Sequence, residues 1–98
     1  MDKLENYDWI ELKPLSRQIL EYTAVHEPQR SQEIAEGLTN VTTRQVDAAI
    51  TKSLVRHSLV VREAKLTKVL KKEYNLIKIT DKGKRYLKWL HEKENGGN

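Results

Sequence analysis

Apolar residues recur at helical spacing after Pro14, at Leu15, Ile19 and Tyr22. Proline suits the first turn of a helix because its missing N–H has no helical partner there. We therefore predict a first helix that begins at Pro14 and ends before Pro28. The preceding residues 8–13 are expected to form either a short lead-in strand or a lead-in helix.

The stretch RSQEIAEGLTN, residues 30–40, predicts a short second helix. Ser31 is a suitable N-cap because its hydroxyl can accept a hydrogen bond from a free backbone N–H. Gly37 weakens the centre of such a helix by about 1 kcal/mol relative to Ala. We therefore expect the helix to end near residues 38–39. Its expected buried residues are Ile34, Ala35 and Leu38.

The next stretch, VTTRQVDAAITK, residues 41–52, carries a nearly complete helix start signal. With Thr42 as N-cap, Gln45 is the third helical residue, so the two can form a reciprocal capping box. Val41 and Val46 then occupy the positions of a hydrophobic staple, which indicates the same start. We predict a helix over residues 42–56. Its inner residues are Val46, Ala49, Ile50 and Leu54, and its outer ones are Thr43, Arg44, Asp47, Ala48, Thr51 and Lys52.

Residues 59–80 predict a β-hairpin. LVVREA (59–64) is rich in β-branched residues, and YNLIKIT (74–80) ends in alternating apolar and polar residues. The intervening KLTKVLKK (65–72) has no Gly, Pro or Asn to mark a turn. A hairpin with a long basic tip is the favoured prediction, and a short helix inserted at 65–72 is the alternative.

A last helix is predicted after the second strand, with Asp81 as its cap and Gly83 allowing close backbone approach. Its expected inward residues are Tyr86, Leu87 and Leu90, with Trp89 beside them. The predicted fold class is mainly α with a small β-hairpin (α+β), in the order α-α-α-β-β-α. Residues 1–13 form a lead-in segment, 14–93 the folded domain and 94–98 a flexible tail.

Composition fits one compact domain: the chain has 98 residues, of which 38% are apolar and 33% charged. Residues 1–41 carry four Lys/Arg against eight Asp/Glu, whereas residues 42–98 carry fourteen against six. This asymmetry favours a surface that attracts polyanions, although a lysine-rich solvated surface has the same composition. The chain has no cysteine and no apolar run near the ~20 residues that span a membrane, and we expect no signal peptide because residues 1–13 lack an apolar segment and a small-residue cleavage site. We expect a cytoplasmic protein.

Residues 14–91 resemble the winged helix-turn-helix family. SQEIAEGLTNVTTRQVDAAITKSL (31–54) looks like its helix-turn-helix, and LIKITDKGKRYLKWL (76–90) is similar to its strand–Leu-Thr-x-x-Gly–helix ending. In that ending the matching residues are Ile79, Thr80 and Gly83. The turn often carries Gly in this family, and Asn40 can replace it by adopting a left-handed conformation. The resemblance implies a small prokaryotic, archaeal or viral transcription regulator that binds double-stranded DNA.

The resemblance also implies that the helix at 42–56 lies in the major groove of DNA. Arg can bind guanine, Gln can bind adenine, and Thr can contact a thymine methyl. The candidates for base contact are Thr43, Arg44, Gln45, Ala48 and Lys52. Gln45 cannot fully form the capping box and contact a DNA base at the same time. The alternative is a solvated outer face, as on any surface helix.

The basic hairpin tip, residues 62–73, resembles the wing of this family. Arg62, Lys65, Lys68, Lys71 and Lys72 face only Glu63 and Glu73, a local net charge of +3. Contacts from such residues to phosphates add affinity without sequence information and weaken with salt. The predicted phosphate-binding set adds Ser31, Thr42, Thr51 and Arg56. The alternative is a lysine-lined edge that blocks unwanted strand pairing.

Aromatic residues near both chain ends, among them Tyr7, either cap a small core or form a homodimer interface. Terminal segments in this family often pair across a two-fold axis, and aromatic residues are favoured at interfaces. The candidate interface residues are Trp9, Tyr86, Trp89 and Leu90. A dimer would place two recognition helices about one DNA turn apart.

Catalytic and metal-binding patterns are lacking in the sequence. His26, His57 and His91 do not have the close spacing of a zinc pair, and there is no Gly-rich phosphate loop or nucleophile elbow. We expect no enzyme, no metal, no cofactor and no small-molecule ligand. The expected function is sequence-specific binding of double-stranded DNA in transcription regulation. The alternatives are a winged-helix protein-interaction module and a non-specific DNA-binding or replication accessory protein.

Overall fold

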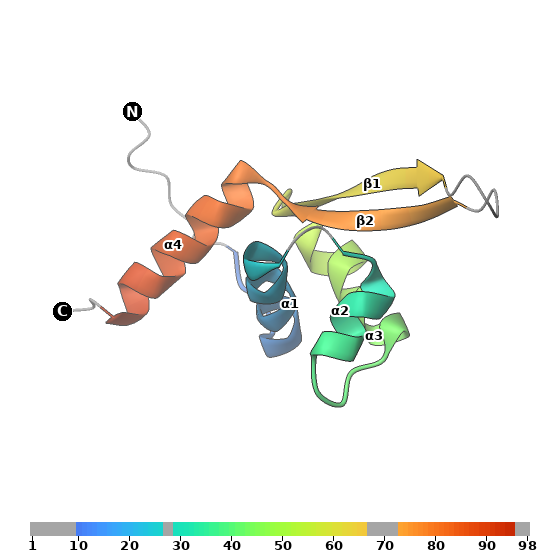
Figure 1. Ribbon diagram of the computed structural model, residues 1–98. Coiled ribbons are helices and arrows are strands. Elements are labelled where there is room, and N and C mark those ends of the chain that lie inside the picture. The colour runs from blue at the N-terminus through green and yellow to red at the C-terminus, as the bar shows by residue number, and fades with distance from the viewer. Residues whose placement is uncertain (1–9, 27–28, 67–72, 96–98) are drawn as a thin grey trace.

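The computed structural model describes residues 10–26, 29–66 and 73–95. Three helices are followed by a two-stranded antiparallel hairpin and a last helix, so the predicted order and fold class are confirmed (Figure 1). The elements are α1 (Pro14–Val25), α2 (Ser31–Gly37), α3 (Thr43–Ala49), the π-helical segment η2 (Ile50–Leu54), β1 (Val60–Leu66), β2 (Glu73–Ile79) and α4 (Asp81–Asn95).

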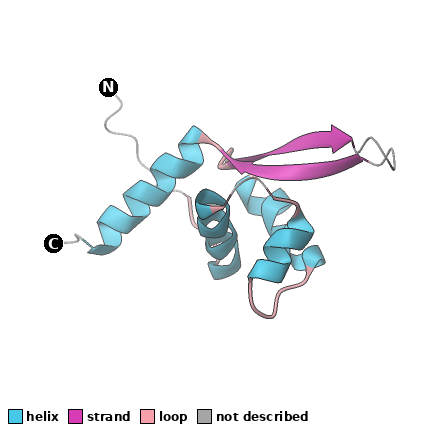
Figure 2. Ribbon diagram, in the orientation of Figure 1, coloured by secondary structure: helices cyan, strands magenta, loops and turns pink. Residues whose placement is uncertain are grey.

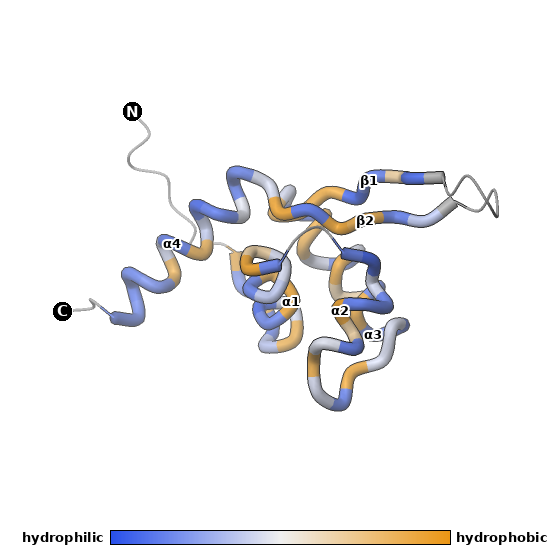
Figure 3. The backbone as a smooth tube through the Cα atoms, viewed as in Figure 1, coloured by the Kyte–Doolittle hydropathy of each residue, from blue (hydrophilic) through white to orange (hydrophobic). Residues whose placement is uncertain are grey.

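The core lies where α1, α2 and α3 meet the base of the hairpin, as the arrangement in Figure 2 and the apolar inner faces in Figure 3 show. The buried residues come from the helices, where the periodicity placed them inward, and from the base of the hairpin. Those with no exposed surface include Ile19, Leu20, Ile34, Val46, Ile50, Leu54, Leu59, Val60 and Ile77. Truncating such a residue to Ala typically costs about 2–5 kcal/mol, a large share of the stability of a small domain.

The first turn of α2 differs from its prediction. The helix begins at Ser31, so the N-cap is Arg30, whose backbone N–H donates to the carboxylate of Glu33 at 2.8 Å. The hydroxyl of Ser31 instead donates to Asp47 on α3. The prediction that Ser31 is the N-cap was wrong, because the partner of its hydroxyl, Asp47, is distant in sequence. Gly37 is the last residue of α2 and not its centre.

The link between α2 and α3 follows the prediction. Asn40 has a φ of 57°, the left-handed conformation expected in place of Gly. Thr42 caps α3 through its Oγ1, which accepts from the N–H of Gln45 at 3.1 Å. Val46 is fully buried and Val41 packs against the core, as the expected staple requires.

The predicted helix 42–56 has two parts. Regular α-helix ends at Ala49, and the N–H of Val55 then donates to the carbonyl of Ile50 at 2.8 Å, five residues back. This wider π-helical ring continues the rod through Leu54. Ile50 and Leu54 are both fully buried, so the core face is maintained through the change of helix type.

The hairpin pairs Val60 with Ile79 at its base and Leu66 with Glu73 at its outer end. Residues 67–72 lie outside the described residues, and so does the alternative of an inserted helix there. Gln29, just before α2, adds an isolated antiparallel bridge to Ile77, whose N–H donates to the carbonyl of Gln29 at 2.8 Å. The hairpin is thereby attached to the helix pair on its β2 side.

The junction between β2 and α4 explains the Ile-Thr-x-x-Gly pattern. Thr80, and not Asp81, caps α4, because the Oγ1 of Thr80 accepts from the N–H of Gly83 at 3.0 Å. The N–H of Thr80 donates to the carbonyl of Leu59 at 3.0 Å. A Cβ on Gly83 would lie 2.2 Å from that same carbonyl oxygen. Glycine is therefore required by a close approach of backbone, and Ser58 (φ 62°) turns the chain beside it.

The N-terminal lead-in belongs to the packed core. Ile10 is 4% exposed, and its carbonyl accepts a hydrogen bond from the hydroxyl of Tyr86 at 3.3 Å. Residues 10–13 form neither a strand nor a helix, so both expectations for the lead-in are wrong there, and Asp8 and Trp9 lie outside the described residues. At the other end α4 extends through Asn95, past the expected domain end at residue 93.

Candidate nucleic-acid interface

The outer face of α3 and η2 carries the residues predicted for base contact. Thr43, Arg44, Gln45, Ala48 and Lys52 are all exposed. Arg44 and Lys52 form no ion pair or hydrogen bond with any residue that the structure describes. Their cationic groups are therefore available to a ligand. In Figure 1 the α3 helix lies on the hairpin side of the molecule, away from the C-terminal end of α4.

Gln45 is engaged in the cap of its own helix. Its Oε1 accepts from the N–H of Thr42 at 2.9 Å, which completes the capping box with the bond from Gln45 N–H to Thr42 Oγ1. Thr42, predicted to contact phosphate, is engaged in the same box. Of the two roles that the sequence left open for Gln45, the structure shows the cap.

Three of the predicted phosphate contacts, Arg62, Thr51 and Ser31, belong to one hydrogen-bond network that includes Asp47. Arg62 on β1 donates through its Nη2 to the Oγ1 of Thr51 on η2 at 2.8 Å and to the carbonyl of Asp47 on α3 at 3.5 Å. The carboxylate of Asp47 accepts from Ser31. These side chains connect α2, the α3–η2 rod and the hairpin at one place. Arg56, another of the set, is exposed just beyond η2.

Charges along the hairpin are partly compensated. The Oε1 of Glu63 lies 3.7 Å from the Nζ of Lys65 and 4.0 Å from the Nζ of Lys78. Both pairs are solvent-exposed, so each contributes little to stability. Lys68, Lys71 and Lys72 of the predicted wing tip lie outside the described residues.

A shallow cleft of about 280 Å³ separates the start of α2 from the hairpin. Arg30 and Arg62 line it together with Tyr74, and the guanidinium of Arg30 lies 5.9 Å from the centre of the Tyr74 ring. Arg30 and Tyr74 carry no signal for this site in the sequence, because they are distant in the chain and come together only in the fold, beside the Gln29–Ile77 bridge. The remaining lining residues are Ser31, Gln32, Asp47 and Asn75.

The candidate dimer residues on α4 differ in exposure. Tyr86 is 2% exposed and belongs to the core, so its place in an interface is corrected: its ring has no free surface for a partner. Burial raises the pKa of its hydroxyl. Trp89 is half-buried, 5.7 Å from the Tyr86 ring, and Lys93 lies 4.9 Å from the Trp89 ring centre. With Leu90 and Leu12 they line a groove of about 240 Å³.

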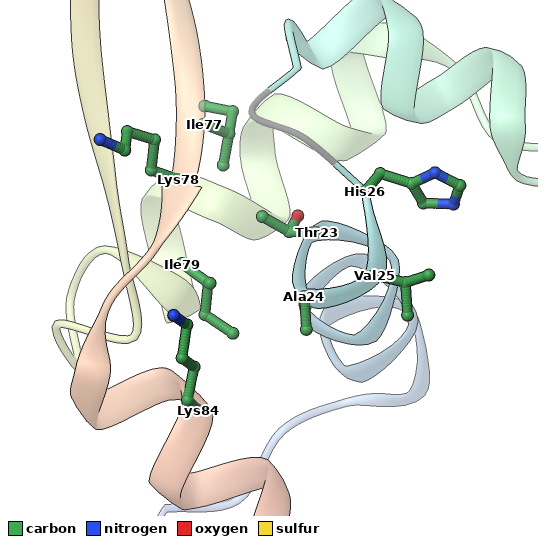
Figure 4. Close-up of a pocket in the computed structure, with 8 residues that line it drawn as sticks. All are labelled: Thr23, Ala24, Val25, His26, Ile77, Lys78, Ile79 and Lys84. Atoms are coloured by element: carbon green, nitrogen blue, oxygen red, sulfur yellow. The ribbon is translucent and has the colours of Figure 1, made fainter.

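A second groove, of about 260 Å³, lies between the end of α1, β2 and α4 (Figure 4). Its walls come from Thr23, Ala24, Val25, Ile77 and Ile79, and its rim from His26, Lys78 and Lys84. Val25 is 80% exposed there. None of these lining residues is an acid, so the groove offers no acid–base pair of the kind that hydrolases use.

Histidines are dispersed in the fold. Burial lowers the pKa of His57, and the nearby Arg56 and Lys82 lower it further. Among residues 10–26, 29–66 and 73–95, no three His or acidic side chains come together as metal ligands would. Nor is any helix in these ranges long and apolar enough to cross a membrane.

Two solved structures share this fold. One, a protein of unknown function from Listeria innocua, superposes with a TM-score of 0.66 at 27% identity, covering 88% of this chain and 55% of its own. The other, a MarR-like transcriptional regulator from Thermotoga maritima, superposes with a TM-score of 0.63 at 29% identity, covering 85% and 55%. This chain thus spans about half the length of each. No protein-family profile and no curated protein matches the sequence.

These likenesses agree with the element order. Four helices and a two-stranded antiparallel hairpin in the order α-α-α-β-β-α form a winged-helix fold, as in the MarR-like neighbour. In such a fold α2 and α3 are the helix-turn-helix pair, and β1 with β2 is the wing.

Proposed function

We propose that this protein binds double-stranded DNA as a transcription regulator, with α3 in the major groove and the hairpin along the backbone. One observation carries the proposal. Arg44 and Lys52 project from the outer side of a capped helix, are exposed and have no partner among the described residues. Cationic side chains held unpaired on such a helix are what a base-reading surface needs. The likeness to a MarR-like transcriptional regulator supports the same role.

Recognition would be divided between two parts of the surface. Arg44 would read guanine through two parallel hydrogen bonds, with Thr43, Ala48 and Lys52 contacting neighbouring base edges or phosphates. Arg56, Lys65 and the lysines of the wing tip would bind phosphates and set the affinity. Gln45 would act mainly by holding the start of α3 through Thr42. No step of this mechanism needs a catalytic residue, a metal or a cofactor, and the protein would act in the cytoplasm.

Dimerisation would double the recognition surface. The exposed parts of Trp89 and Leu90 border the groove on α4, and pairing there would relate two copies by a two-fold axis. Two copies of α3 would then lie about one DNA turn apart, on a pseudo-palindromic site. The predicted interface residue Trp9 lies outside the described residues.

Selection of bound duplexes from a randomised DNA pool tests the proposal. Wild-type protein is expected to enrich a sequence, and the logarithm of its association constant for that sequence should fall linearly with the logarithm of salt concentration. Equal retention of all sequences would instead indicate a non-specific DNA-binding protein. An absence of binding even at low salt would overturn the DNA role and favour a winged-helix protein-interaction module.

A further inference from the structure

Arg62 makes a contact that a free wing residue would not make. It belongs to β1, yet its guanidinium is bound to the Oγ1 of Thr51 at 2.8 Å and to the carbonyl of Asp47 at 3.5 Å. Both acceptors belong to the rod formed by α3 and η2, at the level of its outer face. Arg62 is half-buried, whereas Lys65, on the same strand, is exposed.

The opposite strand is anchored at the same level. Arg62 pairs with Ile77 in the register of the hairpin, and the N–H of Ile77 donates to the carbonyl of Gln29 at 2.8 Å. Both strands are therefore attached to the helical part at this residue pair. Arg62 attaches β1 through its side chain, and Ile77 attaches β2 through its backbone. Closer to the tip, the ring of Tyr74 on β2 still lies 5.9 Å from the guanidinium of Arg30 at the start of α2, and the outer end of the hairpin extends away from the helices (Figure 1).

Asp47 has a structural explanation in the same network. A carboxylate on a DNA-facing helix repels phosphates, so its presence needs a reason. Its side chain accepts from the hydroxyl of Ser31 and its backbone carbonyl accepts from Arg62. Asp47 therefore joins α2 to α3 at the point where the hairpin is attached.

We infer that Arg62 is a positioning residue that sets the angle of the wing against the recognition helix, acting through Thr51 and Asp47 in place of the phosphate contact predicted for it. The inference rests on the proposed function, because it concerns the same DNA surface. A wing held at one angle meets the backbone at a fixed distance from the bases that α3 reads. We call the hydrogen bonds from Arg62 to Thr51 and Asp47 the strut. Loss of the strut would therefore reduce the preference for one DNA sequence and also weaken binding.

Two matched substitutions distinguish the effect of losing the strut from the effect of losing one positive charge. Arg62→Met and Lys65→Met each remove one cation from β1 and keep a long apolar stem. Lys65→Met should lower affinity for selected and random duplexes by the same factor. Arg62→Met should lower the ratio of selected to random affinity by about tenfold, the order expected for loss of a hydrogen bond to a charged group. Equal effects of Arg62→Met on both duplexes would overturn the inference.

Thr51→Val tests the same link without changing charge. Valine keeps the shape of threonine and removes the acceptor of the 2.8 Å bond. If Arg62 acts through Thr51, Thr51→Val should lower the same ratio, and the double variant should lose no more than Arg62→Met alone. Additive losses would mean that the two residues contact DNA independently, and would contradict the strut.

A measurement without DNA keeps the inference separate from the proposed function. The chain has no cysteine, so spin labels can be placed at Ala64→Cys in β1 and Gln18→Cys in α1, both exposed. Pulsed electron spin resonance should give a narrow distance distribution, which broadens in Arg62→Met and stays unchanged in Lys65→Met. An unchanged distribution in Arg62→Met would overturn the strut even if DNA binding stands. Failure of the wild type to bind any DNA would overturn the proposed function alone.

Discussion

The backbone N–H of Thr42 donates to the Oε1 of Gln45 at 2.9 Å, and the N–H of Gln45 donates to the Oγ1 of Thr42 at 3.1 Å. This reciprocal pair satisfies two backbone donors that otherwise have no partner at the start of a helix. A two-point contact with adenine needs both atoms of the Gln45 amide, and one of them is already engaged. Arg44, the neighbouring residue, has no such engagement among the described residues.

Thr42→Ala should lower the free energy of unfolding by about 1 kcal/mol, the usual cost of losing an N-cap hydroxyl. Thr43→Ala is the matched control, because Thr43 is exposed and takes no part in the cap. Urea unfolding followed by circular dichroism measures both variants. A loss in Thr43→Ala as large as that in Thr42→Ala would mean that the capping box does not hold the start of α3.

Gly83→Ala should destabilise the fold by about 1–3 kcal/mol, the typical cost of overpacking. The added methyl would lie 2.2 Å from the backbone carbonyl oxygen of Leu59, which cannot move without displacing β1. Gly37→Ala should cost less, although its Cβ would meet Tyr22 at a similar distance. The half-buried ring of Tyr22 can rotate away, and Ala favours a helix. Thermal unfolding that ranks Gly37→Ala as the more harmful substitution would contradict this account.

Local signals in the sequence predicted the parts of the fold that depend on near neighbours. The cap formed by Thr42 and Gln45, the left-handed Asn40 and the buried faces of the helices all lie within a few residues of their cause. These contacts need no knowledge of the rest of the chain. Exposure of Arg44 on the outer face of α3 follows from the same periodicity.

Contacts between distant residues could not be predicted in this way. Ser31 was expected to cap α2, but Asp47, sixteen residues away, takes its hydroxyl. Arg62 was expected to extend towards phosphate, but Thr51 accepts from it. Tyr86 was predicted to face inward and was also a candidate for a dimer interface, and its hydroxyl donates to the carbonyl of Ile10, seventy-six residues away. In each case the side chain had a choice of partners, and tertiary packing decided it.

An ion-pair network joining α1 to α4 should depend on pH. The Nη2 of Arg17 donates to the Oε1 of Glu94 at 2.7 Å, and its Nε donates to the Oε2 of Glu21 at 3.1 Å. The Nε2 of His91 lies 3.3 Å from the same oxygen of Glu21. Hydrogen bonding from Arg17 lowers the pKa of Glu94 below its ordinary value of 4.5, and Glu94 in turn raises the pKa of Arg17. The stabilisation is therefore complete above the ordinary carboxyl range and is lost as pH falls through the depressed pKa.

Glu94→Gln should accordingly destabilise the protein at neutral pH and lose its effect in acid. Glu92→Gln, an exposed acid on the same helix, is the control and should change little. Because the network is exposed, added salt should reduce the difference between the variants. Denaturation midpoints measured from pH 7 downwards give the comparison. A Glu94→Gln effect that persists unchanged at low pH would contradict the role of this carboxylate.

Dimerisation through α4 predicts a two-copy mass for the wild type in sedimentation at micromolar concentration. Leu90→Lys should give a monomer, because it places a charge where two copies would pack their apolar side chains. Lys88→Glu, on the exposed side of the same helix, should leave the mass unchanged. Circular dichroism checks that both variants fold. A wild-type monomer at high micromolar concentration would count against this interface.

The affinity of Arg44→Ala for selected and random duplexes, measured across a salt series, tests base recognition by α3 most directly. Arg56→Ala is the comparison, because Arg56 is also an exposed arginine but is assigned to phosphate. Arg44→Ala should weaken binding to the selected duplex by about 1–3 kcal/mol and leave binding to random DNA nearly unchanged. Arg56→Ala should weaken binding to both duplexes equally. It should also reduce the slope of log affinity against log salt concentration by about one. An equal loss on both duplexes in Arg44→Ala would contradict base recognition by α3.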